Sequence, residues 1–125
     1  MIRRTIRKPG NLVLFILTIL LCSGCATKTM YYWGEYEGIV YDMYINPGKA
    51  DPLTQIEKLT KGIQNAENQN KPVPPGIFGH LGMMYAMEGK FALAENSFEE
   101  EKRRYSESSV LINRLQSNLN LRKQK

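Results

Sequence analysis

Apolar side chains recur every three to four residues along the chain beyond position 50, which is the spacing of amphipathic helices. The first such run, over residues 52–68, contains Leu53, Ile56, Leu59 and Ile63. Asp51 and Pro52 precede it, in the order expected for an N-cap and a first helical residue. The last run contains Val110, Leu111, Leu115 and Leu119 and ends in basic residues, which suit a helix C-terminus. We therefore predict an all-α domain over residues 51–122.

The first 24 residues have the three parts of a secretion signal. The basic part comes first and consists of Arg3, Arg4, Arg7 and Lys8. An apolar stretch of about ten residues, 12–21, then precedes the small residues Ser23 and Gly24. As a helix this stretch would span only ~15 Å, whereas a bilayer core is ~30 Å thick. Residues 1–24 are thus predicted to be a signal peptide and not a membrane span.

The sequence Leu21-Cys22-Ser23-Gly24-Cys25-Ala26 resembles a lipobox, the signature of bacterial lipoprotein precursors. It departs from that signature at Cys22, where a leucine is usual. The resemblance implies that Cys25 is the lipid-modified first residue of the mature protein, and two or more acyl chains make such an anchor stable. Ala26 is not the aspartate that resembles an inner-membrane retention signal, so we expect the outer membrane, on its periplasmic side more than at the cell surface. An ordinary signal peptide with an unmodified Cys25 is the alternative.

Charge and residue content argue against several classes of function. The chain has 17 basic and 12 acidic residues, a net charge of +5, but four basic residues lie in the signal, which leaves +1. The basic surface needed for nucleic-acid binding is therefore missing. Cys22 and Cys25 form a C-x-x-C pair without further ligands, and His80 is the single histidine. We predict no metal, no cofactor, no catalytic residue and no disulfide, with His80 at the surface or at a groove edge.

Residues 25–50 are predicted to form a tether and an irregular aromatic segment. The segment contains Tyr31, Tyr32, Trp33, Tyr36, Tyr41 and Tyr44. Gly34 and Gly38 interrupt it and disfavour a regular helix. Two interpretations remain open, because tyrosine and tryptophan suit both cores and interfaces: the rings form a lid over the helices, or they form a binding patch that includes Tyr31 and Trp33.

The region from position 75 onward resembles one tetratricopeptide repeat, a helix–turn–helix unit of about 34 residues. The matching positions are Phe78, Leu81, Gly82, Tyr85, Gly89, Phe91, Ala94 and Phe98. The resemblance implies a helix hairpin over about residues 76–104, in which Gly82 and the small Ala94 allow a close crossing. Glu101 and Ser106 depart from the repeat pattern. Glu99 to Glu101 and Lys102 to Arg104 are predicted to form ordinary intrahelical ion pairs.

The chain as a whole also resembles an uncharacterised family of small bacterial lipoproteins, domain of unknown function 4810. The features that carry this resemblance are the lipobox, the aromatic opening at 31–36, the Val40-Tyr41 pair and the single hairpin. The resemblance implies a setting and not an activity. Such proteins look like companions of a curli-channel-like lipoprotein and another small lipoprotein at the cell envelope.

These features favour a non-catalytic scaffold that binds another protein. One repeat cannot bury both of its faces, and a helical core of roughly 70 residues without a disulfide is small. We therefore expect another envelope lipoprotein, or a second copy of the chain, to complete the core. By the repeat resemblance, Met83 and Met87 project into the binding groove, where flexible thioethers suit an apolar segment. The alternative is an envelope protein that binds peptidoglycan or another glycan through its Tyr/Trp cluster.

Overall fold

The computed structural model describes residues 29–124, so the predicted signal peptide and Cys25 lie outside the described residues. The helices are α2 (Tyr36–Ile45), α3 (Pro52–Asn68), α4 (Ile77–Met87), α5 (Phe91–Arg104) and α6 (Ser109–Lys123). Two single turns of 3-10 helix, Pro47–Lys49 and Ser106–Ser108, lie between them, and residues 29–124 contain no strand. The all-α prediction is confirmed.

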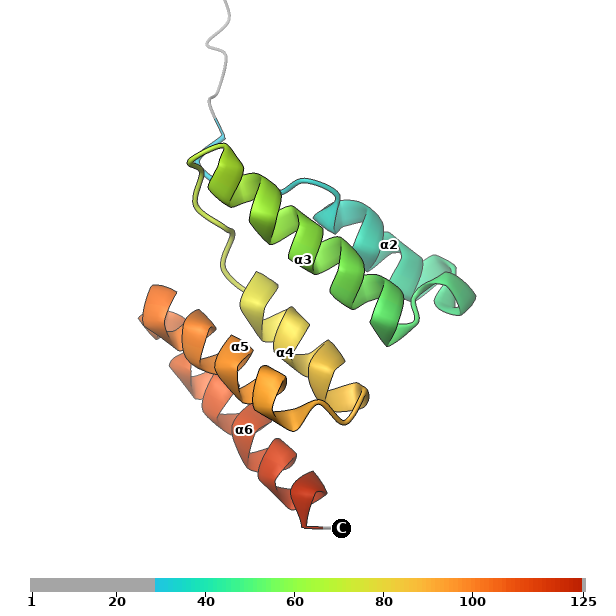
Figure 1. Cartoon of the computed structure of the whole chain (residues 1–125), viewed down its shortest axis with the longest axis vertical. Helices are drawn as coiled ribbons and strands as arrows, with labels where there is room; N and C mark the ends of the chain where they lie inside the picture. The colour runs from blue at the N-terminus through green and yellow to red at the C-terminus, as the bar shows by residue number, and fades with distance from the viewer. Residues whose placement is uncertain (1–28, 125) are drawn as a thin grey trace, which may run out of the picture.

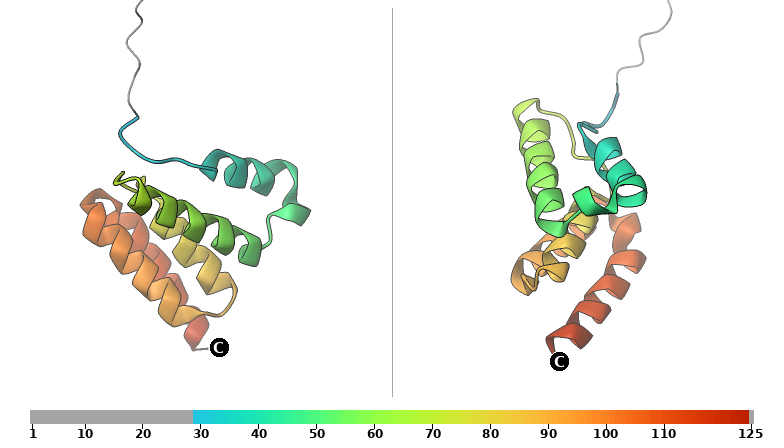
Figure 2. Two further views of the ribbon diagram at one scale, coloured as in Figure 1. Left: turned by 45° about the horizontal axis from the view of Figure 1, so that its top comes forward. Right: turned by 90° about the vertical axis from the view of Figure 1, so that its right-hand side faces the viewer.

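Successive helices run in opposite directions (Figure 1). The helices α3 and α5 form one side, α2 and α6 form the other, and α4 lies between the two sides (Figures 1 and 2). The most extensive packing is between α4 and α5, and α3 also packs along α4. The helix α4 is therefore the centre of the domain.

The predicted start of α3 is confirmed. The side chain of Asp51 accepts a hydrogen bond of 2.9 Å from the backbone N–H of Thr54, and Pro52 is the first helical residue. This cap satisfies one of the backbone donors that a helix start leaves without an intrahelical partner. The helix then extends to Asn68, as the apolar spacing predicts.

The helix α2 corrects the prediction that residues 25–50 lack regular structure. Gly38 lies inside it, and a Cβ atom there would have no neighbour within 4 Å. Gly38 therefore destabilises the helix only through the conformational freedom of its backbone, by about 1 kcal/mol relative to alanine. The burial of Ile39 against α3 offsets this cost, because removing an aliphatic side chain from water contributes about 1.5–3 kcal/mol. Gly34, at φ +48°, turns the chain into the helix.

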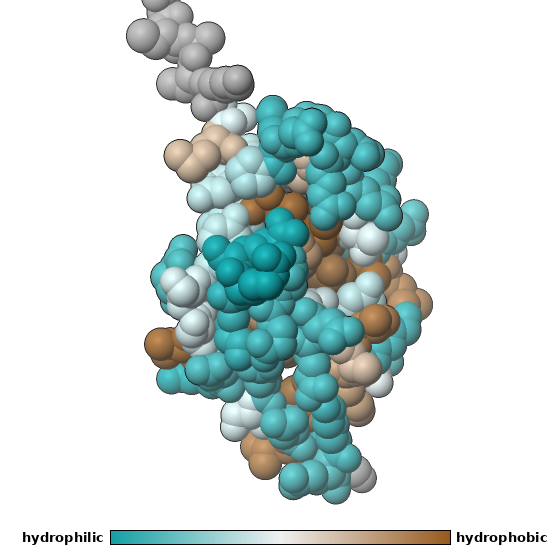
Figure 3. All heavy atoms as spheres, turned by 60° about the vertical axis from the view of Figure 1, so that its left-hand side comes forward, coloured by the Kyte–Doolittle hydropathy of each residue, from teal (hydrophilic) through white to brown (hydrophobic). Residues whose placement is uncertain are grey.

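The core consists of two apolar clusters joined by Tyr85. The larger cluster holds α2, α3 and α4 together and is formed by Ile39, Leu59, Ala66, Val73, Ile77, Phe78, Leu81 and Met84. The smaller one lies between α5 and α6 and is formed by Ala94, Phe98, Ile112 and Leu119. The face shown in Figure 3 is mainly hydrophilic, with hydrophobic atoms showing between its upper and lower parts.

The close crossing predicted at Gly82 is present between α4 and α5. A Cβ atom on Gly82 would lie 2.6 Å from two ring carbons of Phe98 and 3.1 Å from the backbone oxygen of Ala94. Both Ala94 and Phe98 are buried. The helix bounds also agree with the hairpin predicted over residues 76–104.

Candidate functional site

An open groove of about 330 Å³ lies between α2, α4 and α6. Its α2 wall is formed by Tyr36, Val40, Met43 and Tyr44. Its floor on α4 includes Gly79, His80 and Met83, and its α6 wall is formed by Leu111, Ile112 and Leu115. The lining is therefore mostly apolar although the groove is open to water. Such an apolar recess on the surface of a small domain is typical of binding sites.

The structure places Met83 and Met87 on the exposed side of α4. The side chain of Met83 is 39% exposed and that of Met87 is 58% exposed. A second hollow, between α4 and α6, is lined by both methionines together with Leu115 and Leu119. Met83 and Leu115 line both hollows. The two hollows therefore adjoin along α4 up to its last turn, and together they are called the apolar channel below.

Tyr31 and Trp33 do not line this channel. Their rings lie edge to face, 6.4 Å apart between centroids, and Tyr31 makes a similar contact with Tyr105 at 6.4 Å. The ring of Trp33 also lies 6.1 Å from that of Tyr36, which does line the groove. The structure therefore brings Met83 and Met87 together and leaves Tyr31 and Trp33 in a separate cluster behind Tyr36.

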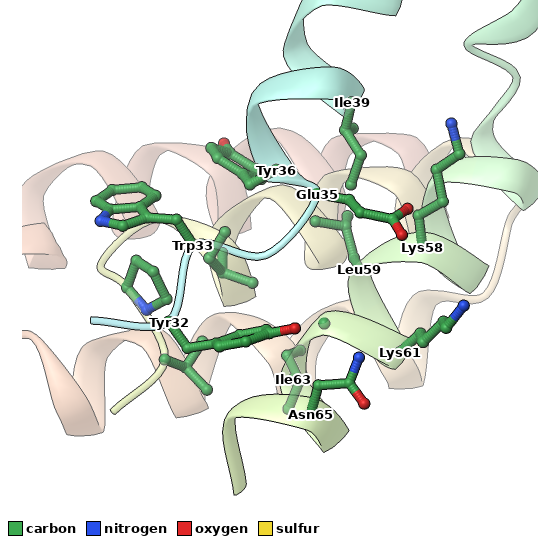
Figure 4. A pocket seen from close by; sticks show the side chains of 14 residues that line it. Tyr32, Trp33, Glu35, Tyr36, Ile39, Lys58, Leu59, Lys61, Ile63 and Asn65 are labelled. Carbon is green, nitrogen blue, oxygen red and sulfur yellow. The ribbon is translucent and has the colours of Figure 1, made fainter. Parts of the chain in front are cut away.

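A small pocket lies beside the aromatic cluster, between residues 32–39 and α3 (Figure 4). Tyr32 and Tyr36 pack against the core there, whereas Trp33 points away from Ile63 and Asn65 (Figure 4). The pocket has a volume of about 40 Å³. Sites for drug-sized ligands have volumes of roughly 300–1,000 Å³, so this pocket is too small for a sugar ring.

Of the two positions predicted for His80, the surface is wrong because its side chain is buried, whereas the position at a groove agrees with the structure. His80 lines the groove, but α2 and α3 pack over its ring: the Tyr36 ring meets it edge-on at 5.8 Å, and its Nε2 lies 2.9 Å from Oε1 of Gln55. The amide nitrogen of Gln55 donates to the backbone oxygen of Ala50, so its oxygen accepts from Nε2–H. Burial also lowers the pKa of His80 below its ordinary value of 6.5. The imidazole is therefore neutral at pH 7.

Glu101 is the site residue that sequence reasoning missed. Its side chain is buried at the groove floor and accepts hydrogen bonds from the backbone N–H groups of Gly76 and Gly79, at 2.7 and 3.3 Å, and from the Ser108 hydroxyl at 3.0 Å. A carboxylate at the N-terminus of α4 is also favoured by the helix dipole. In the sequence, Glu101 is marked only by being an acid at a position where the tetratricopeptide repeat has a small residue.

The neighbours of Glu101 behave as predicted. Glu99 pairs with Lys102 at 2.9 Å, and Glu100 pairs with Arg103 and Arg104, each at 2.6 Å. The hydrogen bond from Arg103 is the main cause that lowers the pKa of Glu100 to about 2. The ordinary ion-pair interpretation is thus confirmed for these two acids and wrong for Glu101.

The described residues define the class of this protein: a small all-α domain with an apolar groove between alternate helices. Within residues 29–124 no helix has the length and hydrophobicity to cross a membrane. No three His, Cys, Asp or Glu side chains in this range are grouped as metal ligands would be.

The chain belongs to the domain of unknown function 4810 family, which matches residues 30–115. The match includes every residue that lines the groove between α2, α4 and α6. Comparisons with the curated proteins and with the solved structures find no match to the chain.

Proposed function

We propose that this protein is a lipid-anchored outer-membrane lipoprotein that serves as a non-catalytic scaffold and binds another envelope lipoprotein in the groove between α2, α4 and α6. The observation that carries the proposal is the apolar channel along α4, with Met83 and Met87 exposed in it. Apolar surface that is covered on binding contributes about 25 cal/mol for each Å² removed from water.

The shape of the channel suits an elongated apolar segment. It extends along α4 and is flanked by helices on both sides, as in the grooves that accept an amphipathic helix. Methionine side chains adapt to different partner surfaces because they are unbranched and flexible. The alternation of α2, α4 and α6 around the groove also agrees with the tetratricopeptide-like architecture that we propose, in which α2 and α3 form a unit ahead of the α4–α5 hairpin.

The family resemblance favours a curli-channel-like lipoprotein complex as the partner. A second copy of the chain is the other candidate. The glycan-binding alternative gains no support from the pocket beside Tyr32, which at about 40 Å³ is too small for a sugar ring. Its candidate site would be the shallow, open hollow lined by Trp33, Tyr36 and Tyr41.

The lipid anchor predicts the result of replacing its cysteine. Cys25→Ser should abolish labelling by a clickable palmitate analogue, because the sulfur of Cys25 is the atom to which the diacylglycerol is attached. An unprocessed precursor should accumulate, whereas Cys22→Ala should be labelled like the parent. Labelling is measured on the protein purified from cells grown with the analogue, and labelled Cys25→Ser would contradict the anchor.

The groove predicts that replacing Met83 and Met87 together by glutamate breaks partner capture. Each substitution places a charge without a partner in an apolar contact, which is costly on association. The measurement is a crosslinking pull-down from intact cells, in which recovery of the partner lipoprotein should fall at least tenfold, equivalent to about 1.4 kcal/mol.

The matched control is Leu93→Glu, since Leu93 on α5 is also apolar and 46% exposed but lies outside the channel. Both variants should keep the circular dichroism and the acylation of the parent. Equal recovery of partners by the double glutamate variant and by the parent would remove the groove as the binding site. Retention of the parent on purified peptidoglycan would support the glycan alternative.

A further inference from the structure

An exposed aromatic stripe runs along the outer side of α2. Trp33, Glu37, Tyr41 and Tyr44 follow one another at intervals of four, four and three residues, which places them on one face of a helix. The three rings are 49%, 58% and 79% exposed, in that order. Trp33, Glu37 and Tyr41 also line one shallow hollow together, so Trp33 lies on this face although it precedes the helix.

This stripe lies at the edge of the domain where the described chain begins. In the left view of Figure 2, residues 29–35 and α2 form the upper edge of the molecule, above α3, α4 and α5. The backbone N–H of Tyr32 donates to the oxygen of Pro72 at 3.1 Å, which ties the segment to the domain. The segment before α2 is therefore held against the domain three residues after Thr29, the first described residue.

The distance from Thr29 to the proposed lipid anchor is short. Four residue steps separate Cys25 from Thr29, and an extended chain spans at most about 3.3–3.6 Å per residue. Thr29 would then lie within ~14 Å of the membrane surface. The stripe begins at Trp33, four residues after Thr29, so its N-terminal end lies close to the point where the described chain begins.

We propose that the stripe of Trp33, Tyr41 and Tyr44 rests on the phospholipid surface and orients the domain on the membrane. This inference depends on the lipid anchor of the proposed function. Tryptophan and tyrosine are the side chains enriched at membrane–water interfaces, because their rings enter the headgroup region while their polar groups stay hydrated. Tyr44 also lines the groove together with Val40 and Met43, so the groove opens at the flank of the anchored domain.

The charges near the stripe indicate which lipid property matters. Glu35 and Glu37 are exposed beside the rings, and Asp42 pairs with Lys58 at 3.3 Å. An acidic border does not favour anionic headgroups, so the rings and not the charges provide the contact. Binding of the stripe is therefore expected to change little when anionic lipid is replaced by zwitterionic lipid.

Trp33 is the chain's only tryptophan and reports on this contact directly. The test uses the acylated mature protein in vesicles of phosphatidylethanolamine and phosphatidylglycerol, and in vesicles of phosphatidylcholine. The expected result is a blue shift of Trp33 emission in both, with stronger quenching by bromines near the headgroup than by bromines near the chain ends. Emission of water-exposed tryptophan, with no quenching by either lipid, would overturn the proposal.

The matched variants are Tyr41→Ser in the stripe and Leu121→Ser on α6, since the two side chains are 58% and 60% exposed. Quenching of Trp33 should decrease for Tyr41→Ser and stay unchanged for Leu121→Ser. Equal quenching in both variants would contradict a role of the stripe, and a blue shift without quenching that appears only after a partner protein is added would assign the stripe to that protein. Flotation of the vesicles with the protein shows separately that the anchor is intact, so failure of the anchor and failure of the stripe are distinguishable.

Discussion

Replacing Gly82 by valine is expected to lower the free energy of unfolding by about 1–3 kcal/mol, the usual cost of overpacking a core. Any Cβ atom at this position would lie 2.6 Å from ring carbons of Phe98 and 3.1 Å from the backbone oxygen of Ala94. The Phe98 ring is buried, so displacing it disrupts the core, and the Ala94 oxygen belongs to the backbone of α5. The two helices must therefore separate. Urea unfolding of the purified mature protein measures the difference.

The control for this prediction is Gly62→Ala in α3. A Cβ atom on Gly62 would have no neighbour within 4 Å, so this substitution should stabilise the protein by up to about 1 kcal/mol through helix propensity alone. The opposite signs of the two substitutions separate close packing from backbone freedom. A Gly82→Val protein as stable as the parent would show that α4 and α5 do not cross as described.

Replacing Glu101 by alanine is the other substitution with a large expected effect. It removes the acceptor of the Gly76 and Gly79 N–H groups and of the Ser108 hydroxyl. The bond from Gly79 is buried, and a buried donor left without a partner costs about 1–3 kcal/mol, so the loss should exceed that of most surface substitutions. Thermal unfolding followed by circular dichroism at neutral pH measures it.

Two matched variants define the role of Glu101. Glu101→Gln keeps one acceptor oxygen and should recover part of the lost stability. Glu99→Ala removes an adjacent acid whose ion pair with Lys102 is exposed, and such pairs contribute only about 0–1 kcal/mol. If Glu101→Ala and Glu99→Ala unfolded at the same temperature, the carboxylate would not be the link between α5 and the start of α4.

The helices with local signals were predictable from the sequence. Asp51 and Pro52 mark the start of α3, and the apolar spacing identifies α3 and the hairpin, because these patterns depend on residues close together in the chain. The helix α2 has no such signal. Its glycines disfavour a helix locally, and the contact of Ile39 with α3, which compensates for them, becomes visible only in the folded chain.

The difference between local patterns and long-range contacts also explains which parts of the candidate site were predicted. Met83 and Met87 followed from the repeat spacing, whereas the α2 wall of the groove required α2 to be helical. His80 is buried through Gln55, which lies 25 residues earlier, and Glu101 is buried through N–H groups 22 and 25 residues earlier. Contacts over such separations leave no periodic pattern in the sequence.

The central claim is that the groove along α4 holds another protein, and photocrosslinking from inside the groove tests it most directly. A photoreactive phenylalanine analogue is placed at Met83 in the acylated protein in intact cells, and at Leu93 as the exposed position outside the channel. A groove that binds a protein should give a discrete crosslinked product from position 83, identified by mass spectrometry as an envelope lipoprotein or a second copy of this chain, and none from position 93. The same products from both positions, or none from position 83, would show that the groove is not the binding site.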